Sequence, residues 1–165
     1  MGDSDFEELW TAITSKHYPI AARPEKSLEL PISLPIGLVE IYRRCHGIKF
    51  FDAVNPPFFL VPPNQIQRTR IDLYGDDCDD DSWGPNQLYS LVKFDGGFLS
   101  IVRNEVQGHD AVVVDSFHEN FADSTQFKIV ATNDYELLTK ILQSDGRLFF
   151  LNEGENDYGF WTRKD

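Results

Sequence analysis

The stretch LYSLVKFDGGFLSIVR, residues 88–103, decides the fold class of this chain. Two runs rich in β-branched and aromatic residues flank Asp95-Gly96-Gly97, where glycine supplies the positive φ that a tight hairpin needs. A third such run, AVVVD at residues 111–115, follows a second turn near Gln107-Gly108. Strands joined by short turns pair antiparallel, so this region predicts a β-meander whose middle strands are covered on at least one face.

Two helices with capping boxes are predicted outside the meander, at residues 4–17 and 133–145. Ser4 with Glu7 begins the first, and Asn133 or Thr132 with Glu136 begins the second. The expected apolar stripes are Phe6, Leu9, Trp10, Ile13 and His17 in the first helix, and Leu137, Leu138, Ile141 and Leu142 in the second.

A further helix is predicted from Leu34-Pro35, where the proline fits the first turn without losing a needed hydrogen bond. Ser33 is its expected N-cap, and Gly47 its expected left-handed C-terminal cap. Leu38, Ile41, Tyr42 and Cys45 form its apolar stripe.

Shorter elements complete the predicted fold. Residues 49–51 and 58–61 have the composition of strands, residues 62–66 that of a short helix with Ile66 inward, and residues 148–151 that of a last strand. The tail at residues 158–161 is aromatic enough to dock on the core. With no internal repeat or linker, the sequence predicts one α+β domain over residues 1–165, with a mixed or mainly antiparallel sheet flanked by helices.

The most charged segment of the chain lies at residues 76–81, where five of six positions are aspartate. The whole chain has a net charge of −12. Because unpaired carboxylates are costly to bury, we expect a solvated loop, beginning near Asp72 and ending near Gly84-Pro85. Its negative field repels nucleic acid and anionic membranes and attracts basic proteins. The predicted partner-binding residues are Asp76, Asp77, Asp79, Asp80, Asp81 and Trp83.

This segment has other interpretations. It can be a solvated loop without a dedicated role, or a calcium site, although its contiguous aspartates do not follow the alternating EF-hand pattern. Trp83 can anchor a protein interface or fold back on the core.

Motifs of catalysis are scarce. The chain lacks the nucleophile elbow, the phosphate-binding loop and the zinc-protease motif. Cys45 lies on an apolar stripe, so we interpret it as a core thiol and not as a nucleophile served by His46. His109 beside Asp110 and His118 beside Glu119 lack the spacing of metal ligands. We therefore predict no enzyme activity, metal or cofactor, and keep a small metal-dependent hydrolase as the third hypothesis.

The beginning of the chain has no apolar signal core, and Phe6 occupies the position where a myristoylation motif needs Ser or Thr. No apolar run approaches the roughly 18 residues of a membrane span. We therefore expect a cytoplasmic protein in which Cys45 and Cys78 stay reduced, although the two could also pair.

The order of these segments resembles the SMI1/KNR4 family, also called the SUKH superfamily. The resemblance rests on LPIGLVEIYRRCHG at residues 34–47, FLVPPNQI at residues 59–66 and LVKFDGGFLSI at residues 91–101. It continues through residues 111–115 and the helix at residues 134–142, covering about residues 34–143. The N-terminal helix and the aromatic C-terminal tail are additions to it.

This resemblance implies an α+β fold and a protein-binding role. Bacterial members of the family are commonly immunity proteins that neutralise a cognate toxin, often a nuclease, and fungal members act in signalling and cell-wall regulation. The leading hypothesis is therefore an immunity protein that covers a basic toxin with an acidic surface. A regulatory or scaffold protein without a toxin partner is the alternative.

Overall fold

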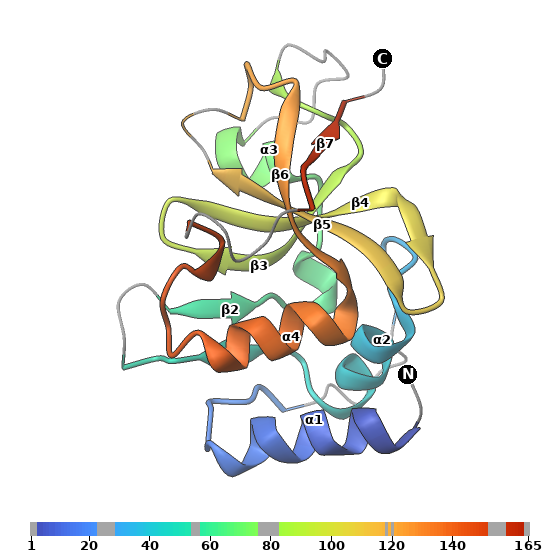
Figure 1. The fold of residues 1–165 in the computed structure, drawn as a ribbon, viewed down its shortest axis with the longest axis vertical. Helices are drawn as coiled ribbons and strands as arrows, with labels where there is room; N and C mark the ends of the chain where they lie inside the picture. The colour runs from blue at the N-terminus through green and yellow to red at the C-terminus, as the bar shows by residue number, and fades with distance from the viewer. Residues whose placement is uncertain are drawn as a thin grey trace.

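The core of the protein is a seven-stranded antiparallel sheet whose strands follow one another in chain order (Figure 1). The computed structural model describes residues 3–22, 29–53, 57–75, 83–117, 119, 121–151 and 158–163, with Asp3 and Ser4 described by their backbone alone. The strands are β1 (Ile48–Phe50), β2 (Phe58–Leu60), β3 (Leu88–Phe94), β4 (Gly97–Gln107), β5 (Asp110–Phe117), β6 (Gln126–Asn133) and β7 (Phe160–Thr162). All six neighbouring pairs are antiparallel, which confirms the predicted single-domain α+β class.

Helices cover both faces of this sheet. The helices are α1 (Asp3–Ser15), α2 (Ile36–Arg44), α3 (Thr69–Tyr74) and α4 (Asp134–Gln143), with 3₁₀ turns η1 (Pro63–Gln65) and η4 (Phe149–Leu151). α4 lies against β5 and β6 and contacts both α1 and α2, so these three helices form a layer on one side (Figure 1). On the other side, Leu73 and Tyr74 of α3 pack on a smaller core cluster that includes Phe121, Phe127 and Trp161.

The capping signal at the start of α4 is confirmed. Asn133 is the N-cap, and its side-chain oxygen accepts a hydrogen bond from the Glu136 N–H at 2.8 Å. Glu136 reaches back to the Thr132 N–H at 2.9 Å. The apolar stripe of α4 is buried as expected. In α1, Phe6, Leu9 and Ile13 are buried, whereas His17 lies past the end of the helix and is exposed; the capping role of Ser4 lies outside the described side chains.

The ends of α2 differ from the prediction. No side chain of the neighbouring sequence caps its first turn, so Ser33 as the N-cap is wrong, and Pro35 occupies that position. The helix ends at Arg44, and Cys45 is already extended. Gly47 is therefore not the C-terminal cap. It is required for close approach instead, because a Cβ there would lie 2.9 Å from the Leu60 carbonyl oxygen.

Two further predictions are wrong, and one strand of the sheet was not predicted. Residues 69–74 form α3, so the region assigned to the acidic loop from Asp72 onward begins as a helix. Strand β6 was not predicted at all. Residues 149–151 form η4 and not a last strand. The short helix before buried Ile66 and the docking of the aromatic tail are both confirmed, since Trp161 of β7 is only 8% exposed.

Candidate protein-binding surface

Trp83 lies where the chain re-enters the described structure after the acidic segment. The residue is 44% exposed, and its ring centroid lies 5.5 Å from that of Tyr74 at the end of α3. Tyr74 in turn lies 6.2 Å from fully buried Phe121. The next residue, Gly84, has a φ of 98°, and a Cβ there would come within 2.3 Å of the Phe121 ring. Trp83 thus rests against Tyr74 and is still partly exposed to solvent; its role as an anchor of a protein interface stays a prediction.

The other predicted contact residues, Asp76, Asp77, Asp79, Asp80 and Asp81, lie outside the described residues, as does Cys78. Gly75 before them and Trp83, two positions after Asp81, are described. Helix α3 ends with Gly75 as a left-handed C-cap, with φ of 76°, and the chain resumes at Trp83. The described chain therefore stops and resumes next to the two residues of the Tyr74–Trp83 ring pair.

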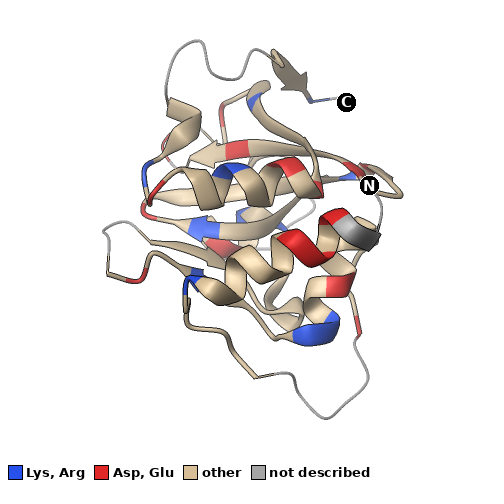
Figure 2. Ribbon diagram, turned by 60° about the horizontal axis from the view of Figure 1, so that its bottom comes forward, with Lys and Arg blue, Asp and Glu red and all other residues tan. Residues whose placement is uncertain are grey.

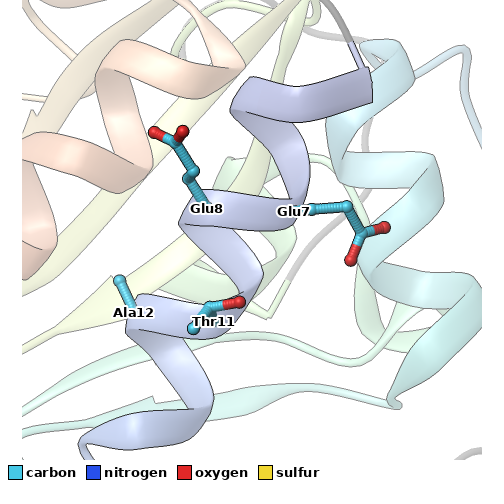
Figure 3. A pocket seen from close by; sticks show the side chains of 4 residues that line it. All are labelled: Glu7, Glu8, Thr11 and Ala12. Carbon is cyan, nitrogen blue, oxygen red and sulfur yellow. The ribbon is translucent and has the colours of Figure 1, made fainter.

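A second acidic surface, which the sequence did not suggest, lies on α1. Figure 3 shows Glu7 pointing toward α2 and Glu8 pointing toward α4. With Thr11 and Ala12, the two glutamates line an open hollow of about 470 Å³. The Arg44 guanidinium binds both carboxylate oxygens of Glu7, and these hydrogen bonds lower the pKa of Glu7. Glu8 forms no ion pair with any described residue.

Many basic side chains of the described chain are engaged inside the molecule. The ion pairs are Arg43 with Glu40, Arg44 with Glu7, Lys49 with Asp52, and Lys140 with Glu136. Lys16 and Lys128 donate to backbone carbonyl oxygens of Leu142 and Phe150. In Figure 2, acidic residues gather on the N-terminal half of α1. Since the chain has 27 acidic and 15 basic residues, the charge that is not balanced within the molecule is negative.

His109 and Asp134 meet where the turn between β4 and β5 touches two helix N-termini. Asp134 is 1% exposed; its Oδ2 accepts the Gly37 N–H of α2 at 2.6 Å, and its Oδ1 accepts the Tyr135 N–H of α4 at 2.7 Å. His109 Nδ1 lies 3.3 Å from Oδ2. The carbonyl oxygen of Gly108 accepts the Ile36 N–H at 2.9 Å. Asp134 therefore supplies the cap of α2 that the local sequence lacks.

This junction has one feature that the hydrolase hypothesis required, because a histidine meets a carboxylate beside a pocket of about 270 Å³. However, both oxygens of Asp134 already accept backbone N–H groups, and the side chains described in the lining include no Ser, Thr or Cys as a nucleophile. Within the described residues, no group of three potential ligands could hold a metal ion. We interpret the pair as a structural junction; His118 lies outside the described residues.

Cys45, the other candidate nucleophile, is buried in the core. Its exposed fraction is 0%, and burial raises the pKa of its thiol. A buried thiol of raised pKa is a weak nucleophile at neutral pH, which agrees with the predicted core role. None of the described helices is both long and apolar enough to cross a bilayer.

Comparison with known proteins gives one informative relative. The chain is similar to "Immunity protein YokJ" of Bacillus subtilis (strain 168), with 21% identity over 134 residues, which is 80% of this chain and 72% of the relative. No family model matches the chain. No solved structure matches it either.

Proposed function

We propose that this protein is an immunity protein of the SMI1/KNR4 type, which binds a cognate protein toxin and neutralises it without catalysing a reaction. The similarity to a protein named as an immunity protein is the observation that carries this proposal. The antiparallel sheet with a helical layer on one face is compatible with the fold that the family resemblance implies. We propose the cytoplasm as its place of action.

The proposed contact surface is the acidic segment together with Trp83. Asp76, Asp77, Asp79, Asp80 and Asp81 supply negative charge, and the half-exposed indole of Trp83 supplies an aromatic anchor. Because the Trp83 ring contacts Tyr74, which itself lies against Phe121, the indole has less freedom to lose on binding than an unsupported side chain.

The proposed mechanism is electrostatic and steric. A nuclease binds phosphates with a cationic surface, and an acidic protein can cover such a surface. Complementary charge also steers association, raising its rate by roughly 10- to 1,000-fold. The internal pairing of this chain's own lysines and arginines supports the proposal, since it leaves carboxylates available to a partner.

The proposal is tested by affinity capture from the source organism with the intact tagged protein, followed by mass spectrometry. We expect one enriched protein with a basic domain that is toxic when expressed alone and harmless when co-expressed with this chain. A Trp83→Ala variant should capture less of it, whereas Tyr135→Ala, which removes another exposed aromatic, should capture as much as the unaltered chain. If the captured partner is not toxic, or if its toxicity persists on co-expression, the immunity proposal is wrong.

A further inference from the structure

A small pocket opens at the end of β5, on the face of the sheet that α4 covers further along. It has a volume of about 160 Å³ and is lined by Asp115, Phe117, Ser124, Gln126, Phe127 and Lys128. On β5, Ala111 and Val113 face the large core, and Asp115 follows at the same two-residue period. An aspartate thus occupies a position where the alternation of the strand would place an apolar side chain.

The described surroundings compensate the carboxylate of Asp115 only in part. Its Oδ1 atom is buried and has no hydrogen-bond partner among the described residues. Lys128 is the cation of the lining, but its ammonium group donates to the Phe150 carbonyl oxygen and forms no ion pair with Asp115. A buried acceptor without a donor is destabilising, and most such groups in proteins find a partner.

The titration of Asp115 agrees with this geometry. Burial raises the pKa of its carboxyl group to about 6, and the attraction of Lys128 offsets only part of that effect. At neutral pH the group is therefore mostly ionised, in surroundings that disfavour its charge. A positively charged donor that entered the pocket would relieve both the missing hydrogen bond and the uncompensated charge.

We propose that this pocket receives a single basic side chain, arginine or lysine, from the partner protein. The inference rests on the proposed function, because it adds a second, more specific contact to the acidic segment. The pocket volume is below the roughly 300–1,000 Å³ of sites for drug-sized molecules, so one side chain fits it better than a whole small ligand.

The surroundings of the pocket suit arginine in particular. Phe117 in the lining provides apolar surface for the stem of a long side chain, whereas the ring of Phe127 packs on the opposite face of the sheet against Phe121 and Trp161. Phe160 of β7 pairs in register with Lys128 and is 61% exposed, so an aromatic ring stands beside the pocket. Guanidinium groups stack on aromatic rings and bind carboxylates with directed N–H donors. A carboxylate with Phe117 in the lining and exposed Phe160 opposite Lys128 in the sheet matches that chemistry.

The test uses the intact, isotope-labelled protein and two small probes, followed by NMR of the backbone amides. N-acetyl-arginine amide carries the charged guanidinium, and N-acetyl-citrulline amide is its neutral counterpart of similar shape. We expect the arginine probe to cause saturable shifts at residues 115–117 and 124–128 and the citrulline probe to cause none there. Asp115→Asn should weaken the arginine probe by at least about tenfold. Asp123→Asn removes the same charge from an exposed neighbouring position and should bind as the unaltered protein does.

Equal shifts from both probes, the absence of saturable shifts at these amides, or unchanged binding by Asp115→Asn would each overturn the pocket proposal. The amide spectrum of each variant shows directly whether it is folded. Because the probes involve no toxin, this result is separate from the capture experiment. If a toxin is captured but the pocket at Asp115 does not bind the arginine probe, the immunity proposal is retained and only the pocket proposal is wrong.

Discussion

Asp134 illustrates how one side chain organises distant parts of this chain. It is the first residue of α4, yet it caps α2, because its Oδ2 accepts the N–H of Gly37, 97 positions earlier, at 2.6 Å. Its other oxygen binds the Tyr135 N–H, and His109 stands beside it. A carboxylate at two helix N-termini is stabilised by N–H donors and by both helix dipoles.

Replacing Asp134 by Ala should lower the free energy of unfolding by about 3 kcal/mol. The change leaves the buried Gly37 N–H without an acceptor and removes a charge from two helix ends. Urea unfolding measures the difference, with Asp110→Ala as the control. Asp110 lines the pocket beside His109 and Asp134 but is exposed, so its replacement should change the free energy of unfolding by less than about 0.5 kcal/mol. Equal losses in the two variants would show that Asp134 has no capping role.

Asp115 predicts a dependence of stability on pH. Its folded pKa of about 6 lies above the ordinary value near 4, so the folded chain holds this proton more tightly than the unfolded chain. Stability contributed by this group is present below about pH 4, falls as the pH rises to about 6, and is level above that. The two-unit shift corresponds to at most about 3 kcal/mol.

Asp115→Asn should therefore match the unaltered protein near pH 4 and exceed it by about 2 kcal/mol near pH 7. Urea unfolding over this range measures the difference, and Asp123→Asn should show no comparable rise. The comparison isolates Asp115 because Lys128, the charged residue that faces it in the pocket, is unchanged in both variants. A constant difference at all pH values would contradict the raised pKa.

Among the helices and strands, the sequence predicts best those in which the spacing of apolar residues agrees with a turn or cap signal. The β3–β4 hairpin follows from its glycine turn, and α4 follows from its capping box and apolar stripe. Helix α3 was missed because six residues are too short for a helical period to emerge. Strand β6 was missed although Phe127 and Ile129 alternate with Lys128, the ordinary strand signal.

The proposed binding surfaces depend on contacts between different elements, which the sequence does not predict. Trp83 was selected from the sequence because it follows the acidic segment, but its support by Tyr74 depends on packing between α3 and the segment after it. The pocket at Asp115 joins residues from β5 with residues from β6 and the connection before it. No local pattern specifies that meeting, since it arises only from the register of the sheet.

We expect the buried side chain of Trp161 to hold strand β7 against β6. Trp161 is 8% exposed, and its ring centroid lies 5.9 Å from that of Phe127 on β6, whereas its neighbour Phe160 is 61% exposed. Trp161→Ala should cost about 3 kcal/mol, and Phe160→Ala less than about 0.5 kcal/mol. Thermal or urea unfolding gives the stability, and hydrogen exchange at the β6 amides reports whether β7 has detached. Similar losses for the two variants would mean that β7 is not anchored by the buried indole.

At the scale of the whole molecule, charge is the property that connects fold and function. The chain carries a net charge of −12, and the described lysines and arginines largely contact its own carboxylates, carbonyl oxygens and aromatic rings. A rigid α+β body with surplus acid can recognise a basic protein by shape and charge without chemistry of its own. Such recognition weakens with ionic strength, because salt screens exposed charges over about 10 Å at 0.1 M.

The proposed immunity mechanism is tested by the affinity for the captured partner at low and high salt, measured by titration calorimetry. One variant carries Asn at positions 76, 77, 79, 80 and 81, and the control neutralises five exposed acids elsewhere, Glu29, Asp95, Asp110, Glu119 and Asp145. We expect at least about tenfold weaker binding at low salt and a flatter salt dependence for the first variant, with a smaller change for the control. Unchanged affinity of the first variant at both salt concentrations would contradict the proposed mechanism.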